Sequence, residues 1–78
     1  MAAVQPNAKL YGTGSCHLCA EAEAILDTAK ITAIKIDIAE DEILLGRYSL
    51  RIPVLQRTDN DAELDWPFDS AAVSRFLK

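Results

Sequence analysis

The sequence has no apolar run approaching the roughly 18 residues that a membrane-spanning helix needs. It also lacks an excess of basic residues, because 8 Lys and Arg stand against 12 Asp and Glu and give a formal net charge of -4. A chain of this charge is repelled by a phosphate backbone, so nucleic acid is not expected as a partner. Residues 1–7 have neither the basic nor the apolar segment of a secretory signal, and we therefore expect a cytoplasmic location.

Internal repeats, low-complexity tracts and linker-like stretches are also absent from the 78 residues. Residues 1–78 are therefore expected to form one small domain, near the size at which a single core is just sufficient. Half of the residues are apolar, which is enough for a core and too many for a disordered chain. Nothing in the pattern predicts an obligate assembly, so a monomer is expected.

Cysteine and histidine are scarce, and all three such residues stand together as Cys16, His17 and Cys19. In a reducing compartment two cysteines are typically catalytic or metal-binding rather than structural. A glycine-containing loop, residues 12–14, precedes them and an amphipathic segment follows, so Cys16 is expected at a helix N-terminus with Cys19 one turn in.

That position predicts the chemistry of Cys16. The first N–H groups of a helix have no intrahelical partner and carry the positive end of the helix dipole. They stabilise a thiolate, and in such motifs the pKa of a cysteine falls from about 8.5 to roughly 3.5–7.5. The N–H of Cys19 is one of the few groups that can point back at the sulfur of Cys16.

Apolar spacing predicts seven helices and strands. Residues 17–30 carry apolar side chains at helical intervals with acidic residues on another face. Ile34, Ile36 and Ile38 alternate with polar residues, which is typical of a strand with one buried face. The predicted strands cover 8–11, 34–38, 52–56 and 63–66, and the predicted helices cover 17–30, 40–48 and 70–77.

The sequence also predicts how two of these helices begin. An acidic cluster at residues 40–42 suits the first turn of the second helix. Asp69 is expected as the N-cap of the third, with Phe68 and Val73 packed together as a hydrophobic staple. The residues expected to face inward from the first helix are Leu18, Ala22, Ile25, Leu26 and Ala29, and those from the second are Ile43, Leu44 and Tyr48.

The element order is β-α-β-α-β-β-α. A β-α-β unit implies a right-handed crossover between parallel strands, and the following hairpin adds an antiparallel pair. The prediction is therefore an α/β domain with a four-stranded mixed sheet and helices on both faces. A Cys-x-x-Cys pair beside a βαβ unit is a thioredoxin-like redox signature.

The segment Leu10-Tyr11-Gly12-Thr13-Gly14-Ser15-Cys16-His17-Leu18-Cys19, with Arg51-Ile52-Pro53-Val54-Leu55 further on, resembles a glutaredoxin-like protein of the thioredoxin superfamily. The resemblance extends over residues 9–77. It implies a thioredoxin-like fold, thiol–disulfide oxidoreductase activity, and a cis proline at Pro53 facing the active-site sulfur.

The chain departs from ordinary glutaredoxins at four places. They carry Cys-Pro-Tyr-Cys, a lysine in place of Thr13, and Thr-Val in place of Arg51-Ile52. Residues 65–69 also replace the Gly-Gly turn and polar segment that hold glutathione. No bound cofactor is therefore expected, and glutathione is a possible reductant rather than an obligatory partner.

The resemblance assigns roles to the site residues. Cys16 attacks a substrate disulfide and Cys19 then attacks Cys16 to release the reduced substrate. Arg51 is a candidate for holding the thiolate or a substrate carboxylate, and the Ile52 backbone beside Pro53 can pair with a substrate chain as an added strand. Three of these residues have an alternative interpretation. His17 either adds positive charge beside the sulfur or only faces solvent, and Trp66 either flanks the site or caps the core. Arg51, if it does not hold substrate, is a plain surface charge.

The expected substrates are protein or low-molecular-weight disulfides, with recycling by glutathione or a thioredoxin-reductase-type enzyme. Three other functions stay open. One is a zinc site shared across a dimer, because such a site needs about four ligands and Cys16, Cys19 and His17 are the only soft donors in one chain. The others are an iron–sulfur cluster bridged between two chains through Cys16 and glutathione, and a non-catalytic binding module with the same fold.

Overall fold

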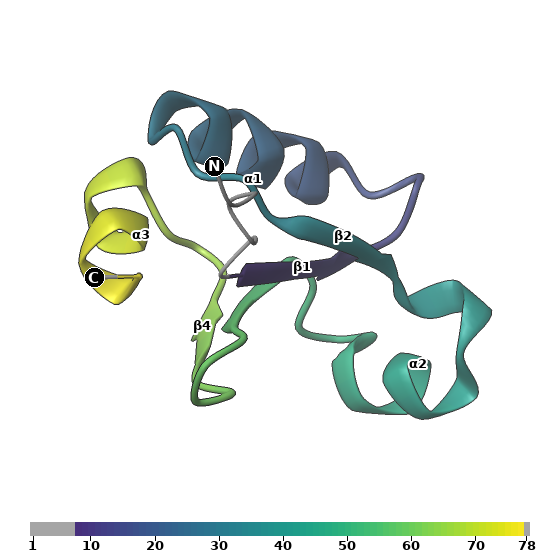
Figure 1. The fold of residues 1–78 in the computed structure, drawn as a ribbon. Coiled ribbons are helices and arrows are strands. Elements are labelled where there is room, and N and C mark those ends of the chain that lie inside the picture. The colour runs from purple at the N-terminus through teal and green to yellow at the C-terminus, as the bar shows by residue number, and fades with distance from the viewer. Residues whose placement is uncertain (1–7, 78) are drawn as a thin grey trace, which may run out of the picture.

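The computed structural model describes residues 8–77, and the segment that carried the argument against a secretory signal lies outside this range. The strands are β1 (Ala8–Gly12), β2 (Ile34–Asp37), β3 (Val54–Arg57) and β4 (Glu63–Asp65). The helices are α1 (His17–Thr28), α2 (Glu42–Tyr48) and α3 (Ser70–Phe76), with a 3₁₀ turn, η1 (Ile38–Glu40), between β2 and α2. The predicted element order is confirmed, as is the mixed four-stranded sheet (Figure 1).

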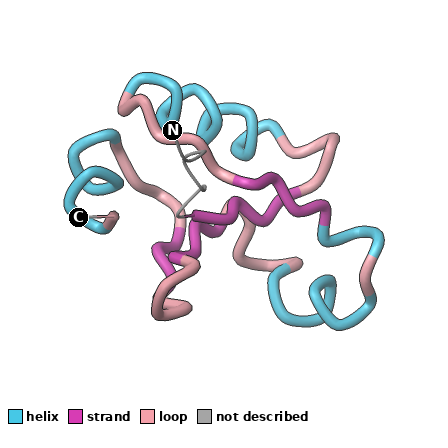
Figure 2. Tube along the Cα trace, viewed as in Figure 1, coloured by secondary structure: helices cyan, strands magenta, loops and turns pink. Residues whose placement is uncertain are grey.

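The sheet has the strand order β2-β1-β3-β4. β1 pairs parallel with β2 and antiparallel with β3, so Leu10 lies opposite Lys35 on one side and Leu55 on the other. β3 and β4 form the predicted hairpin, with Leu55 opposite Leu64. Helices α1 and α3 cover one face of this sheet and α2 covers the other (Figures 1 and 2).

Each face of the sheet has its own apolar cluster, because successive strand residues point to opposite faces. Leu10 and Leu55 face α1 and α3, whereas their neighbours Tyr11 and Val54 face α2. The buried residues of the first cluster are Ala8, Leu10, Ala22, Leu26, Leu55, Phe68 and Val73. Those of the second are Tyr11, Ile38, Tyr48 and Val54.

Helix α1 ends earlier than the predicted residue 30. Lys30 adopts a left-handed backbone with φ of 59°, and the N–H of Ile31 donates to the carbonyl of Leu26 at 2.9 Å. The N–H of Lys30 donates to the carbonyl of Asp27 at 3.0 Å, which completes a Schellman motif. This stop usually carries glycine. Because lysine occupies this position, no residue in the sequence signals the end of the helix here.

Three apolar residues expected on buried faces are exposed: Leu18 by 42%, Ile34 by 44% and Ile43 by 74%. Ile34 lies on β2, an edge strand of the sheet. Leu18 lies in the first turn of α1. Ile43 points away from the sheet because the α2 residues that pack on the second cluster, Leu44 and Tyr48, are four positions apart and define the inner face.

The other boundaries move by one or two residues. The predicted strand 34–38 ends at Asp37, whose side chain caps η1 by accepting from the N–H of Ala39. Asp41 caps α2 and accepts from the N–H of Ile43 and of Leu44, so this helix begins at residue 42. The third strand begins at Val54 rather than at residue 52.

The predicted start of α3 is confirmed. Asp69 is the N-cap, and its carboxylate accepts from the N–H of Ala72 at 2.7 Å. Phe68 and Val73, on either side of this cap, are both buried in the first apolar cluster. Within residues 8–77, no helix has the length and apolar composition that a membrane crossing requires.

Candidate functional site

The cysteine pair lies where β1 runs into α1. Cys16 is the N-cap of α1 with an extended backbone, and the N–H of Cys19 donates to its Sγ at 3.1 Å. The contact predicted from the sequence is therefore present. The two residues form a disulfide, with 5.1 Å between their Cα atoms, inside the usual range of roughly 4.4–6.8 Å.

The two sulfurs differ in their access to solvent. Cys16 is half-buried, whereas only 5% of Cys19 is exposed and it belongs to the buried face of α1. An incoming thiolate therefore meets Cys16 more readily than Cys19. The order predicted from position along the helix, with Cys16 outermost, agrees with this burial.

Gly12, the last residue of β1, lies directly against Cys19. A Cβ atom added there would lie 2.7 Å from the Cys19 Sγ and 3.2 Å from its Cβ. Gly14, in the same loop, has nothing within 4 Å of the corresponding position. The position of the buried Cys19 sulfur thus requires glycine at residue 12 but not at residue 14.

A cavity of about 260 Å³ opens beside the disulfide, between α1 and β2. Cys16 and Cys19 both line it, together with three charged residues, Glu23 from α1 and Lys35 and Asp37 from β2. Lys35 and Glu23 form an ion pair across the two elements. The hydrogen bond from Lys35 to this carboxylate, followed by its charge, raises the pKa of Lys35.

Of the residues predicted to surround the cysteines, His17 is exposed to solvent, whereas Ile52 and Pro53 pack against the rest of the protein. The side chain of His17 is 90% exposed and its Nε2 lies 3.7 Å from a carboxylate oxygen of Glu21, one turn on. The Ile52–Pro53 peptide is cis, with Pro53 fully buried and Ile52 packed against the second apolar cluster. Neither Ile52 nor Pro53 lines the cavity beside the disulfide.

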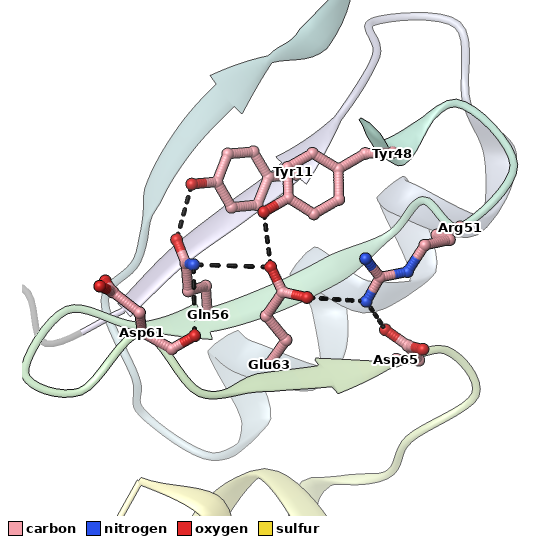
Figure 3. Close-up of polar contacts among 7 residues, drawn as sticks. All are labelled: Tyr11, Tyr48, Arg51, Gln56, Asp61, Glu63 and Asp65. Atoms are coloured by element: carbon pink, nitrogen blue, oxygen red, sulfur yellow. Dashed lines mark hydrogen bonds and ion pairs between the residues drawn. The ribbon is translucent and has the colours of Figure 1, made fainter. Parts of the chain in front are cut away.

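Arg51 is held by two carboxylates of β4, the second strand of the hairpin (Figure 3). Its Nη2 donates to a carboxylate oxygen of Glu63 at 2.8 Å and to one of Asp65 at 2.6 Å. Its guanidinium carbon also lies 5.3 Å from the centroid of the Tyr48 ring. The two carboxylates raise the pKa of Arg51 further above its usual range. Arg51 is therefore more than a plain surface charge, and its role toward substrate stays a prediction.

Sequence reasoning missed the tyrosine pair beside Arg51. The rings of Tyr11 and Tyr48 stack with centroids 4.3 Å apart on the α2 side of the sheet. The Tyr11 hydroxyl donates to the side-chain carbonyl of Gln56 at 2.7 Å, and that of Tyr48 donates to the Glu63 carboxylate at 2.5 Å (Figure 3). Only the apolar periodicity of Tyr48 pointed to its burial, and no sequence signal indicated the partners.

The Tyr48–Glu63 bond should make stability fall in acid. The Tyr48 hydroxyl, and after it the Arg51 guanidinium, hold the pKa of Glu63 below its ordinary value. Because the folded pKa lies below the unfolded one, this contribution is complete above the unfolded pKa and is lost as the pH falls through the folded pKa. We expect Tyr48→Phe to lower the free energy of unfolding by about 1.5–3 kcal/mol near neutral pH. On acidification the variant should then lose less further stability than the wild type does.

Urea unfolding from neutral pH down to about pH 3 measures this difference. Tyr11→Phe is the matched control, because it removes a hydroxyl that donates to the uncharged Gln56. It should cost only about 0.5–1.5 kcal/mol and leave the acid slope unchanged. Equal acid slopes in the two variants would contradict the role of the Tyr48 hydroxyl.

Trp66 packs on the core. Its ring meets that of Phe68 edge to face with centroids 5.0 Å apart, and it adjoins the first apolar cluster. The following Trp66–Pro67 peptide is cis, which the sequence did not predict. These contacts favour the prediction that Trp66 caps the core over the alternative that it flanks the site.

Within residues 8–77, no three His, Cys, Asp or Glu side chains gather to hold a metal, so these residues do not form a zinc site within one chain. A zinc site shared between two chains stays a prediction. The disulfide also leaves neither Cys16 nor Cys19 as a thiolate ligand in this form.

Comparison with known proteins places this geometry among relatives. A crystal structure of protein XcR50 from X. campestris is 38% identical, covers 90% of this chain and 93% of its own, and has a TM-score of 0.82. A solution structure of XcR50 gives 36% identity, 91% coverage of each chain and a TM-score of 0.81. Protein Ne2328 from Nitrosomonas europaea, also solved in solution, is 28% identical over 100% of this chain and 99% of its own, with a TM-score of 0.69.

A search of curated protein sequences finds no match. The family model described as Glutaredoxin-like domain (DUF836), in contrast, matches residues 7–78. With its thioredoxin-like fold and its Cys16–Cys19 pair, the chain belongs to the glutaredoxin-like domain family.

Proposed function

We propose that this protein is a thiol–disulfide oxidoreductase that exchanges disulfides through Cys16 and Cys19. The observation that carries the proposal is the N–H of Cys19 donating to the Sγ of Cys16 at the start of α1. A sulfur that accepts this bond, at the positive end of a helix, is stabilised as a thiolate and as a leaving group. Membership of a glutaredoxin-like family supports a redox role of this kind.

The reaction starts from the dithiol form. The Cys16 thiolate attacks one sulfur of a substrate disulfide, forms a mixed disulfide, and releases the other sulfur as a thiolate. Cys19 then loses its proton and attacks the Cys16 sulfur. The disulfide between Cys16 and Cys19 closes, and the second substrate thiolate leaves. Two electrons pass from the protein to the substrate, and the protein is left in the form described by the structure.

The segment before β3 supplies the remaining parts of the proposal. The Ile52 backbone, next to the cis Pro53, can pair with a substrate chain only through its carbonyl, because its N–H already donates to the carbonyl of Tyr48 at 3.1 Å. Arg51 interacts with a substrate carboxylate only in competition with Glu63 and Asp65, which already hold its Nη2. Protein and low-molecular-weight disulfides are the proposed substrates. Glutathione or a thioredoxin-reductase-type enzyme is the proposed source of electrons, and no bound cofactor takes part.

Alkylation of the reduced protein tests the proposal. We expect iodoacetamide to modify Cys16 rapidly well below pH 8, since its thiolate persists below the usual cysteine pKa of about 8.5. Cys19 should react slowly at the same pH because it is buried. Peptide mass mapping over a pH series separates the two rates. If both cysteines instead alkylate like a free thiol, the chain is a binding module with a passive cysteine pair.

A further inference from the structure

Arg51 lies at the same edge of the sheet as the cysteines. β3 runs antiparallel to β1, and the pairing of Val54 with Tyr11 puts the start of β3 beside the end of β1. Gly12, the next residue of β1, lies against Cys19. The segment that leads into β3 therefore brings Arg51 toward the site of exchange, and 36% of the Arg51 side chain is exposed to an incoming substrate.

The charge of Arg51 is already paired within the chain (Figure 3). Its Nη2 donates to carboxylate oxygens of both Glu63 and Asp65. The Tyr48 hydroxyl donates to the same Glu63 carboxylate, and the Tyr48 ring lies beside the guanidinium, so these contacts hold Glu63 and Arg51 in place. One cation thus faces two anions, and the group has a surplus negative charge.

The cavity beside the disulfide has the same imbalance. Glu23 and Asp37 line it together with one cation, Lys35, whose ammonium is paired with Glu23. A protonated His17 would also face a carboxylate, because its Nε2 lies 3.7 Å from an oxygen of Glu21. Each of these cations therefore has a carboxylate of the chain within ion-pair distance, and the cavity contains one more carboxylate than cations.

A substrate carboxylate gains little at such a site. To bind Arg51 it would have to displace a carboxylate that the hairpin already holds there, and it would meet surplus negative charge as it approached. An ammonium group on the substrate is instead attracted by the surplus charge of both groups. Repulsion of one class of substrate, rather than a dedicated pocket for the other, would then produce the specificity.

We propose that Glu63 and Asp65 determine which disulfides this protein exchanges: by pairing with Arg51 they withhold its charge from substrate carboxylates, so neutral and cationic disulfides are favoured over anionic ones such as oxidised glutathione. This inference rests on the exchange function proposed above. The reaction is unchanged, since the dithiol gives two electrons to the substrate, the bond between Cys16 and Cys19 closes, and the substrate leaves as two thiols. Of the two proposed sources of electrons, glutathione is itself anionic and is therefore less suitable than a thioredoxin-reductase-type enzyme.

Three disulfides of similar size and different charge test the proposal: cystamine, a dication; bis(2-hydroxyethyl) disulfide, which is neutral; and dithiodipropionate, a dianion. The rate at which each oxidises the reduced protein is measured by quenching with an alkylating agent and mass spectrometry. Each rate is divided by that of the same disulfide with free dithiothreitol, which removes differences in intrinsic reactivity. At low ionic strength we expect cystamine to react about 10-fold or more faster than dithiodipropionate. Salt at about 1 M should bring this ratio close to one, because it screens charges beyond about 3 Å.

Asp65→Asn removes one of the two carboxylates from Arg51. It should raise the rate of dithiodipropionate relative to that of cystamine by about 3-fold to 10-fold. Asp59→Asn is the matched control, because it likewise removes a carboxylate from an arginine of the hairpin, Arg57, and both aspartates are 58% exposed. Arg57 lies opposite Ala8 at the start of β1, away from the end that leads to the cysteines, so the ratio should stay at the wild-type value.

Arg51→Gln is the second variant, and its expected effect has the opposite sign. It leaves the carboxylates of Glu63 and Asp65 without their cation, so the preference for cystamine should increase. An unchanged or smaller preference in this variant would contradict the proposal.

Two other results would overturn the proposal. A dianion that reacts as fast as the dication, or faster, would show that Arg51 or the N-terminus of α1 attracts substrate carboxylates. Equal changes of the ratio in Asp65→Asn and Asp59→Asn would show that the net charge of the chain, rather than the charge beside the cysteines, controls the rates. If the neutral disulfide reacts no faster with the protein than with dithiothreitol, the exchange function itself is refuted.

Discussion

Replacing Cys16 with serine should abolish disulfide exchange, and replacing Cys19 with serine should stop it after one step. A serine hydroxyl does not form a thiolate, so Cys16→Ser has no nucleophile at the half-buried end of α1. Cys19→Ser keeps the attacking sulfur but lacks the group that resolves the intermediate. It should therefore accumulate a stable mixed disulfide between Cys16 and the substrate.

Insulin reduction and mass spectrometry measure the two outcomes. Turnover by Cys16→Ser should fall to the uncatalysed background. Cys19→Ser, incubated with a small aromatic disulfide, should gain the mass of one substrate half on the peptide that contains Cys16. Cys19→Ser could still turn over if glutathione resolves the mixed disulfide, so the assay is run with and without glutathione. Turnover by Cys16→Ser comparable to the wild type would remove Cys16 from the mechanism.

Replacing Gly12 with alanine should destabilise the oxidised protein by about 1–3 kcal/mol, the usual cost of overpacking. The new Cβ would lie 2.7 Å from the Cys19 Sγ, a distance at which one of the two atoms must move. That sulfur is held in the disulfide and its residue in the first turn of α1, so it has little room to yield. The cost should be smaller in the reduced protein, where the freed sulfur can rotate.

Gly14→Ala is the control for this experiment. It lies in the same loop with open space around its Cβ position, and no glycine among the described residues has a positive φ. Alanine there should be neutral or stabilise the fold by about 0.4–1 kcal/mol, since it restricts the unfolded chain. Urea unfolding of both variants, oxidised and reduced, gives the four free energies. A Gly12→Ala protein as stable as Gly14→Ala would show that Cys19 does not depend on this contact.

The elements most accurately predicted were those set by local patterns. Asp69 is predictable as a helix cap because an acceptor side chain flanked by an apolar staple is a short-range signal. The hydrogen bond from the N–H of Cys19 to the Cys16 sulfur is predictable for the same reason, since the two residues are three positions apart. The end of helix α1 is not predictable in this way, because the left-handed turn at Lys30 carries no glycine to mark it.

Arg51 illustrates what local patterns miss. Its position before Ile52 and Pro53 suggested a free charge or a substrate contact. The structure shows two carboxylates from β4 on its guanidinium, 12 and 14 residues away in sequence. That pairing depends on how β4 is placed beside β3, which no spacing within either strand specifies.

The sequence by itself determined the order of the elements, the alternation that gives the sheet two apolar faces, and the cysteine pair at the start of α1. These features follow from contacts between residues two to four positions apart. The tertiary structure decided that Gly12 lies against Cys19, that Glu23 and Lys35 meet beside the disulfide, and that Tyr48 bonds to Glu63. Such contacts arise only when the crossover and the strand register bring distant segments together, because side-chain partners are then selected by space rather than by sequence interval.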